Sequence, residues 1–183
     1  MDYPKDELLW FPMRVTYHRE MQVKACLDSL HVENFLPMKR DLILAEGGWK
    51  ETLVPAIQNL LFVRSDQVTL TELKHSVREL EPLRYMTWRP LESESHTILH
   101  VPDRQMENFM KPASVQDDSV KFLENGSYLD CAGRSVVITA GPFEGVEGVI
   151  KRIHKNKYVV VQIKHVAALA INYVPSAFLR YLE

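Results

Sequence analysis

Cysteine is scarce in this chain of 183 residues, and long apolar runs are absent. The two cysteines, Cys26 and Cys131, lie far apart, and no Cys/His spacing suits zinc, so we expect two small buried or half-buried side chains in a reducing compartment. There is no run of about 18 apolar residues, and no cationic start followed by an apolar core. We therefore expect a cytoplasmic protein without a membrane span or secretory signal.

A surplus of positive charge is also lacking. The 22 Lys and Arg residues are outnumbered by 24 Asp and Glu residues, which gives a net charge of −2. This balance argues against a general nucleic-acid coat protein, which needs a broadly basic surface. Five histidines are expected on the surface, and none of them has a Ser, Cys or Asp at a spacing that would make a nucleophilic site: His75, His96, His100, His154 and His165. We expect no enzyme, no cofactor and no metal.

Residues 1–111 alternate between strand-like and helix-like patterns. Strands are predicted at residues 10–17, 32–38, 59–64 and 84–88. Helices are predicted at residues 18–30, 69–80 and 102–112, the second with a capping box formed by Thr69 and Glu72. Residues 41–56 fit no period, but Gly47-Gly48 indicates an exposed hairpin tip within them.

The rest of the chain changes character. Residues 112–127 carry a net charge of −2, one proline and few large apolar residues, which predicts a polar tether with a brief ordered stretch at residues 120–123. From residue 128 to 183, closely spaced strand patterns predict a small β-barrel; they fall at residues 135–140, 148–153, 158–164 and 167–174. This last region has a net charge of +3, with basic residues clustered around residues 151–157.

The stretch from residue 136 to 150, VVITAGPFEGVEGVI, is the most informative part of the chain. Gly141-Pro142 predicts a turn, which a side chain at position 141 would obstruct if the turn needs a positive φ, and Gly145 allows a second reversal. Gly148 lies where a strand must bend or another backbone approaches closely. The glycines are expected to build the barrel, whereas for Phe143 a structural role and a binding role both stay open.

These residues resemble the KOW motif of NusG-like proteins, in which a hydrophobic strand is followed by Gly-Pro-Phe-x-Gly and then Gly-x-Val. KOW barrels also occur in ribosomal proteins, and the first region decides between the two. It resembles the NGN domain of NusG homologues in four places: Trp10-Phe11, Arg19-Glu20, Val63-Arg64 and Val101-Pro102-Asp103-x-x-Met106. The segments Arg-Val-Thr-Tyr-His-Arg-Glu and Phe-Leu-Pro-Met are similar to those of specialised NusG paralogues, the UpxY-like antiterminators of polysaccharide operons.

The resemblance implies an α+β fold and a role in transcription elongation and antitermination. It places an NGN domain (an antiparallel sheet flanked by helices) at residues 1–111, a linker at residues 112–127 and an SH3-like KOW β-barrel at residues 128–183. The implied partner is RNA polymerase, bound at the β′ clamp helices across the cleft from the β gate loop. Closing the polymerase clamp would suppress pausing or termination.

The polymerase-binding residues implied by the resemblance are Trp10, Phe11, Ile57 and Leu60. The chain departs from the family here, because Ile57 stands for a Phe and Leu60 for a Tyr of the usual Pro-Leu-Phe-Pro-Gly-Tyr-Val-Phe-Val. Aliphatic replacements keep an apolar patch but lose aromatic area, which lowers the expected affinity. Because this stretch is irregular and flanked by proline, we expect Ile57 and Leu60 to be exposed.

Tyr17, His18 and Arg19 lie at the predicted strand-to-helix junction. By resemblance this junction faces the non-template DNA strand, where Arg19 at a helix amino terminus would take a phosphate and Tyr17 would stack on an extruded base. A solvated loop without a ligand is the alternative.

Two alternative functions stay open. The first is a general NusG that acts with Rho or NusE through the barrel loops; the loop at residues 164–169 lacks the aromatic residue of well-known NusG barrels, which argues against it. The second is a ribosome-associated KOW protein that binds folded RNA, against which stand the negative net charge and the lack of a long basic tail. We expect a monomer with no membrane contact.

Overall fold

The computed structural model describes residues 4–89, 96–123, 133–153 and 156–182. The chain divides into two compact units, residues 1–37 with 58–103 and residues 38–57 with 104–183. The first combines a sheet with helices, and the second is mainly β-structure, so the predicted α+β class is confirmed. Cys131, His154 and Lys155 lie outside the described residues. The boundaries at residues 111 and 127 stay predictions.

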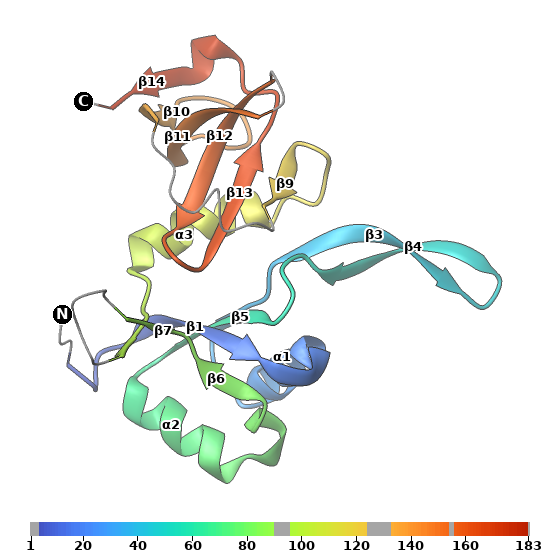
Figure 1. The fold of residues 1–183 in the computed structure, drawn as a ribbon, viewed down its shortest axis with the longest axis vertical. Coiled ribbons are helices and arrows are strands. Elements are labelled where there is room, and N and C mark those ends of the chain that lie inside the picture. Colours follow the sequence, from blue (N-terminus) through green and yellow to red (C-terminus); the bar gives the residue numbers. More distant parts are fainter. Residues whose placement is uncertain (1–3, 90–95, 124–132, 154–155, 183) are drawn as a thin grey trace. The chain divides into compact units, whose positions relative to one another are not determined.

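A four-stranded antiparallel sheet forms the centre of the first unit (Figure 1). Its order is β2-β5-β1-β6, with β2 at Asn34–Phe35, β5 at Leu60–Ser65, β1 at Leu9–Val15 and β6 at Leu83–Tyr85. The two central strands pair from Leu9↔Ser65 to Arg14↔Leu60 and bury successive residues rather than alternate ones. Strands that are buried on both faces have near-continuous apolar sequences, which explains the runs in β1 and β5.

The helices of the first unit begin and end at slightly different residues from those predicted. Helix α1 spans Glu20–Ser29 and buries Val23 and Leu27, but Leu30 is exposed. Helix α2 spans Gln67–Ser76, and a 3-10 turn at Arg78–Leu80 follows it. Two short strands, β7 at Thr87–Trp88 and β8 at Thr97–Ile98, pair with each other.

The predicted capping box of Thr69 and Glu72 is wrong. The N-cap of α2 is Asp66, whose carboxylate accepts the Thr69 backbone N–H at 2.8 Å. Asp66 is an excellent N-cap residue with extended backbone geometry, so the helix begins two residues earlier than Thr69.

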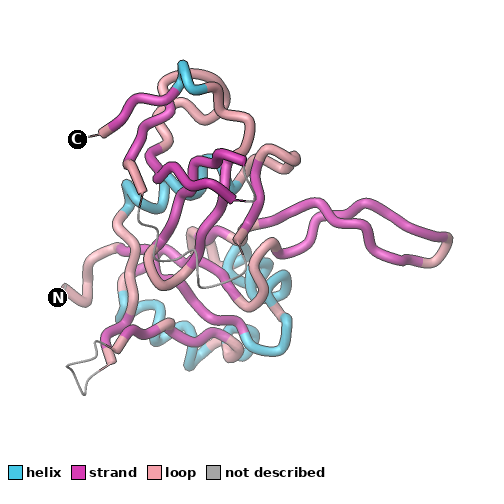
Figure 2. Tube along the Cα trace, turned by 45° about the horizontal axis from the view of Figure 1, so that its top comes forward, coloured by secondary structure: helices cyan, strands magenta, loops and turns pink. Residues whose placement is uncertain are grey.

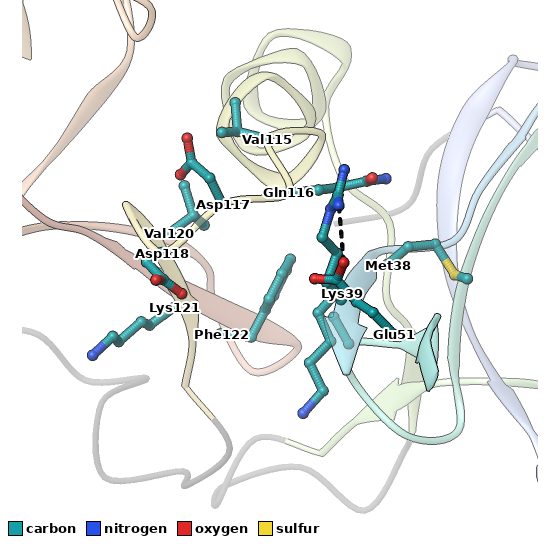
Figure 3. Close-up of a pocket in the computed structure, with 12 residues that line it drawn as sticks. Met38, Lys39, Glu51, Val115, Gln116, Asp117, Asp118, Val120, Lys121 and Phe122 are labelled. Carbon is teal, nitrogen blue, oxygen red and sulfur yellow. Dashed lines mark hydrogen bonds and ion pairs between the residues drawn. The ribbon is translucent and has the colours of Figure 1, made fainter. Parts of the chain in front are cut away.

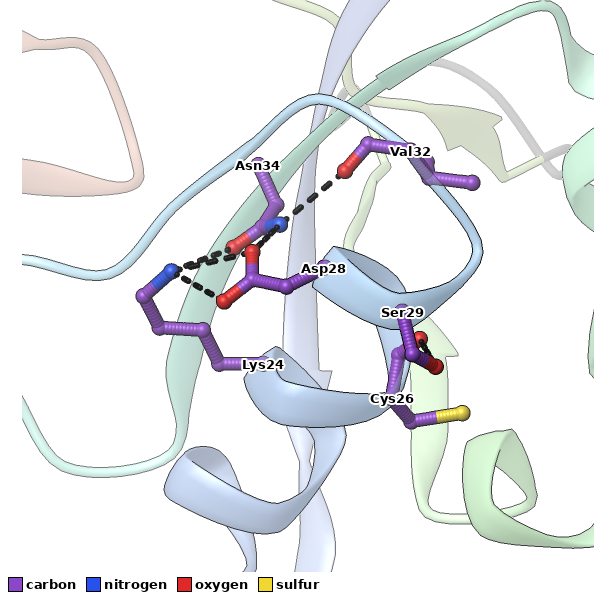
Figure 4. A network of polar contacts seen from close by, with 6 residues as sticks. All are labelled: Lys24, Cys26, Asp28, Ser29, Val32 and Asn34. Atoms are coloured by element: carbon purple, nitrogen blue, oxygen red, sulfur yellow. Dashed lines mark hydrogen bonds and ion pairs between the residues drawn. The ribbon is translucent and has the colours of Figure 1, made fainter.

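A polar network joins α1 to β2 (Figure 4). Lys24 forms an ion pair with Asp28 at 2.9 Å, and the Asn34 amide donates to the same carboxylate at 2.7 Å. Hydrogen bonds from Lys24 and Asn34 hold the pKa of Asp28 below its usual value. Of the strand predicted at residues 32–38, only β2 forms in this sheet, and Met38 already belongs to β3. Pro37, between them, has no N–H with which to continue the ladder.

The second unit contains a six-stranded antiparallel sheet that curls into a small barrel (Figures 1 and 2). Its order is β14-β10-β11-β12-β13-β9, with bounds at Leu179–Tyr181, Ser135–Ile138, Glu147–Ile153, Asn156–Ile163, Ala167–Ile171 and Val120–Phe122. The brief ordered stretch predicted near residue 120 is therefore β9, a strand of this sheet. A 3-10 turn at Ser176–Phe178 precedes β14.

Helix α3, at Asp103–Ala113, contacts the barrel through its polar side. The Asn108 side-chain amide donates to the Glu147 carbonyl at 2.8 Å, and the Asn108 Oδ1 accepts the Glu147 N–H at 2.7 Å. Arg104 forms an ion pair with the Glu147 carboxylate at 2.7 Å, and Lys111 donates to the Glu144 carbonyl. Asn108 thus satisfies both backbone groups of the residue at which β11 begins.

Two long strands, β3 at Met38–Ala45 and β4 at Gly48–Pro55, form a hairpin on their own. Among the described strands, none pairs with either outer edge, and Figure 2 traces the hairpin as a two-stranded arm. The predicted turn at Gly47-Gly48 is confirmed, with φ of 104° and 119°. The strands themselves were not predicted, because their apolar residues are exposed and mixed with charges.

None of the helices in the described part of the chain is long and apolar enough to cross a bilayer.

Candidate binding surfaces

The turn between β1 and α1 presents three exposed residues, Tyr17, His18 and Arg19. Tyr17 and His18 have φ of 64° and 52°, in the left-handed region that non-glycine residues rarely adopt. The Tyr17 side chain is 77% exposed, and the Arg19 guanidinium lies 5.9 Å from the centre of its ring. The turn is exposed, and its geometry offers an aromatic face beside a cation.

A buried carboxylate anchors this turn. Glu20, the first residue of α1, is buried, and its Oε1 accepts the backbone N–H of Asn59 at 2.7 Å. Asn59 has a φ of 61°, and its carbonyl accepts the Val15 N–H at 3.0 Å. Asn59 therefore ties the end of β1 to the start of α1, which fixes the backbone on both sides of Tyr17.

The expectation that Leu60 is exposed is wrong. Leu60 begins β5 and is only 3% exposed, and Trp10 and Phe11 are equally buried in β1. The run from Leu60 to Val63 is apolar at every position, so it fills a central strand covered on both faces. Ile57, in the loop before β5, is half-buried and is the only member of the predicted set of four with exposed surface.

Sequence reasoning missed an apolar face on the β3–β4 hairpin. Leu44 is directly opposite Trp49, and the two side chains are 72% and 71% exposed. Leu42 and Leu53 are also exposed, and their register places them on the same face. The signal in the sequence was the alternation of Leu42, Leu44 and Trp49 about the Gly47-Gly48 turn. We call these four residues the hairpin face.

The same side of the hairpin carries an ion pair between Arg40 and Glu51, whose nitrogen and oxygen atoms lie 3.4 Å apart. An isolated two-stranded hairpin is marginally stable in water, and an exposed apolar patch with polar neighbours is typical of a protein-interaction site. The arrangement therefore suits contact with a partner protein.

A hollow near the hairpin base has mixed charges and no catalytic constellation (Figure 3). Its lining includes cations and carboxylates from the hairpin and from the segment before β9: Lys39, Arg40, Glu51, Asp117, Asp118 and Lys121. Hydrogen bonds from the Ser119 hydroxyl and N–H lower the pKa of Asp117. Among the residues that the structure describes, no group of three His, Cys, Asp or Glu side chains could hold a metal.

The glycine-rich loop between β10 and β11 has the geometry that the sequence predicts. Gly141 and Gly145 have φ of 87° and 84°, which only glycine adopts without strain. At Gly148 a Cβ would lie 2.7 Å from the Val160 carbonyl oxygen, so the expected close approach of another backbone is confirmed. Pro142 is exposed and Phe143 is buried. A packing role therefore accounts for Phe143.

The KOW motif family matches residues 132–164, which include the loop just described. The solved structure "Domain interaction in Thermotoga maritima NusG" is similar at 17% sequence identity and a TM-score of 0.49, covering 98% of this chain and 100% of that one. No curated protein sequence matches the chain. The second unit of this α+β chain is thus similar to the KOW motif family over residues 132–164.

Proposed function

We propose that this protein is a NusG-like transcription elongation factor that binds RNA polymerase and suppresses pausing or termination. The partners implied by the resemblance are the β′ clamp helices and the β gate loop of the polymerase. The finer proposal is an UpxY-like antiterminator of a specialised operon, in the cytoplasm, acting as a monomer. The factor makes and breaks no bond; it favours the closed clamp by binding that state more tightly.

The observation that carries this proposal is the hairpin face, together with the KOW motif. Leu42, Leu44, Trp49 and Leu53 are exposed on one face of a hairpin whose outer edges pair with no other described strand. A large protein partner would cover this apolar area and stabilise the hairpin. Ile57 lies two residues beyond the end of β4 and would extend the contact along the chain.

Trp10, Phe11 and Leu60 would support the proposed polymerase contact only indirectly, because they are buried. They belong to the core of the central sheet, so they would fix the backbone beside Ile57 rather than touch the polymerase. A substitution such as Leu60→Asp would place a charge in that core and would test folding, not binding.

The exposed turn at Tyr17, His18 and Arg19 supports a contact with the displaced non-template strand. Tyr17 offers a ring face for an unpaired base, and Arg19 offers a cation for a phosphate. This second contact would make the effect of the factor depend on the template position.

Transcription by purified RNA polymerase on a template with defined pauses tests the proposal. We expect the full chain to shorten the pauses about 5- to 150-fold, which corresponds to a coupling of ~1–3 kcal/mol. Arg19→Ala and His18→Ala should alter the response at particular pauses while leaving polymerase binding intact. Unaltered pausing and termination at saturating factor would refute the proposed function.

A further inference from the structure

Charge is unevenly distributed along the barrel strands of the second unit. Between residues 133 and 182 there are seven Lys or Arg residues but only two acidic residues, Glu144 and Glu147. Both acids lie at or before the start of β11, where α3 contacts the barrel. At the other end of the same sheet, three cations, Arg134, Arg152 and Lys157, are exposed.

The strand register brings these cations together on one face. Arg152 in β11 is directly opposite Lys157 in β12. The Ile150 N–H donates to the Arg134 carbonyl at 3.0 Å, so Arg134 extends β10 opposite Ile150, two residues from Arg152. Residues two apart in a strand share a face, and diagonal neighbours on adjacent strands are within reach of long side chains.

An exposed aromatic residue continues the same row. Tyr181 in β14 is opposite Val136 in β10, which places it on the face of Arg134. The Arg134 guanidinium lies 5.5 Å from the centre of the Tyr181 ring, and this side chain is 50% exposed. The row Tyr181, Arg134, Arg152 and Lys157 follows the strand order β14-β10-β11-β12, with Arg134 just before β10. We call it the rim strip.

A second exposed tyrosine lies at the far end of the rim strip. Val159 in β12 is opposite Ile171 in β13. Because the strands are antiparallel, the same register two residues further places Tyr173 opposite Lys157. Tyr173 is 78% exposed and has a φ of 58°, a conformation that persists in an aromatic residue only where the surroundings impose it. β9 is the next strand of the sheet, and continuing its register with β13 places the acidic Asp118 opposite Tyr173. The basic strip therefore ends at β13.

The cations of the rim strip are available to a ligand. Among the ion pairs between described residues, none involves Arg134, Arg152 or Lys157. Adjacent strands lie about 4.8 Å apart, so the row measures about 19 Å along the curled sheet from β14 to β13. A ligand that follows the row must carry repeated negative charge along its length, and it must offer flat faces to the tyrosines at both ends.

We propose that the rim strip binds a single-stranded polynucleotide. Phosphates contact Arg134, Arg152 and Lys157, and unpaired bases stack on Tyr181 and Tyr173. Single-stranded nucleic acid combines repeated negative charge with exposed base faces, the two features that this surface complements. An acidic peptide would satisfy the cations but would leave the tyrosines unused, and a duplex has no free base faces. The proposed site lies on the barrel and is separate from the turn at Tyr17.

Fluorescence anisotropy with labelled ten-nucleotide single-stranded RNA and DNA, added to the full chain, tests this proposal. Three phosphate contacts predict that the logarithm of the affinity falls with the logarithm of salt concentration with a slope of about −2. Arg152→Ala should reduce that slope by about 0.7, and Tyr181→Ala should weaken binding about 5- to 150-fold. Tyr181→Phe, which keeps the ring, should bind normally. Equal affinity for RNA and DNA, or a preference for RNA, both fit the proposal, the latter adding a 2′-hydroxyl contact.

Lys164→Ala is the matched control, because Lys164 is exposed just beyond the opposite end of β12. It should bind like the unaltered chain. The proposal is overturned if neither oligonucleotide binds at low salt, if Lys164→Ala weakens binding as much as Arg152→Ala, or if an unlabelled duplex or an acidic peptide competes as well as the single strand. It is also overturned if Arg19→Ala abolishes binding while the rim variants retain it, since the turn at Tyr17 would then be the only nucleic-acid site.

Discussion

The Glu20 carboxylate accepts the backbone N–H of Asn59 at 2.7 Å, across 39 residues of sequence. This contact holds both ends of the exposed turn at Tyr17. Glu20 is the first residue of α1, and the Asn59 carbonyl accepts the N–H of Val15 at the end of β1. We therefore expect Glu20→Ala to lower the free energy of unfolding by about 1–2 kcal/mol, because the half-buried Asn59 N–H would be left without its acceptor. Urea unfolding followed by circular dichroism measures this.

Glu20→Gln is the control for that prediction. Its side-chain oxygen can still accept the Asn59 N–H, so it should lose clearly less stability than Glu20→Ala. Equal stability of Glu20→Ala and the unaltered chain would show that this hydrogen bond does not hold the turn.

The N-cap of α2 predicts a dependence of stability on pH. Hydrogen bonds from Thr69 hold the pKa of Asp66 below its usual value, so folding favours the ionised carboxylate. Its contribution is complete above the unfolded-state pKa of about 3.9 and is lost as the pH falls through the lower folded-state pKa. At pH 7 Asp66→Ala should cost about 1 kcal/mol.

The comparison is made by measuring unfolding of both proteins between pH 7 and pH 2. We expect the stability gap between the unaltered chain and Asp66→Ala to narrow below about pH 4. A gap that stays constant down to pH 2 would mean that the charge on Asp66 plays no part.

Gly148 predicts a packing defect in the barrel. A Cβ at this position would meet the Val160 carbonyl oxygen at 2.7 Å and a Val159 methyl group at the same distance. Because the backbone of β12 cannot easily move away, Gly148→Ala should destabilise the barrel by about 1–3 kcal/mol. Gly47→Ala is a useful contrast, since a Cβ there would have no other atom within 4 Å and only backbone strain is added. Amide hydrogen exchange in β11 and β12 should quicken only in Gly148→Ala.

The barrel could be predicted from the sequence because its strands are short and rich in β-branched residues. Turn-forming residues such as glycine and proline separate them. The predicted turns at Gly141 and Gly145 are present, and both glycines have positive φ angles. The apolar run that starts at Leu60 indicated a buried strand, but its neighbour could not be inferred locally, because β5 pairs with β1, far away in the sequence. The hairpin face escaped prediction for the opposite reason: apolar alternation normally indicates burial, whereas Leu44 and Trp49 are exposed.

The central claim is that the chain binds RNA polymerase through the hairpin face. The affinity of the full chain for purified core polymerase tests this most directly. Replacing Leu44 and Trp49 together by serine removes exposed apolar area without disturbing the core. Val68→Ser is the matched control, because Val68 is an exposed apolar residue on α2. We predict that the double variant, with an unchanged circular dichroism spectrum, loses at least tenfold in affinity, or about 1.4 kcal/mol, while Val68→Ser binds normally. Unchanged affinity of the double variant would contradict the account.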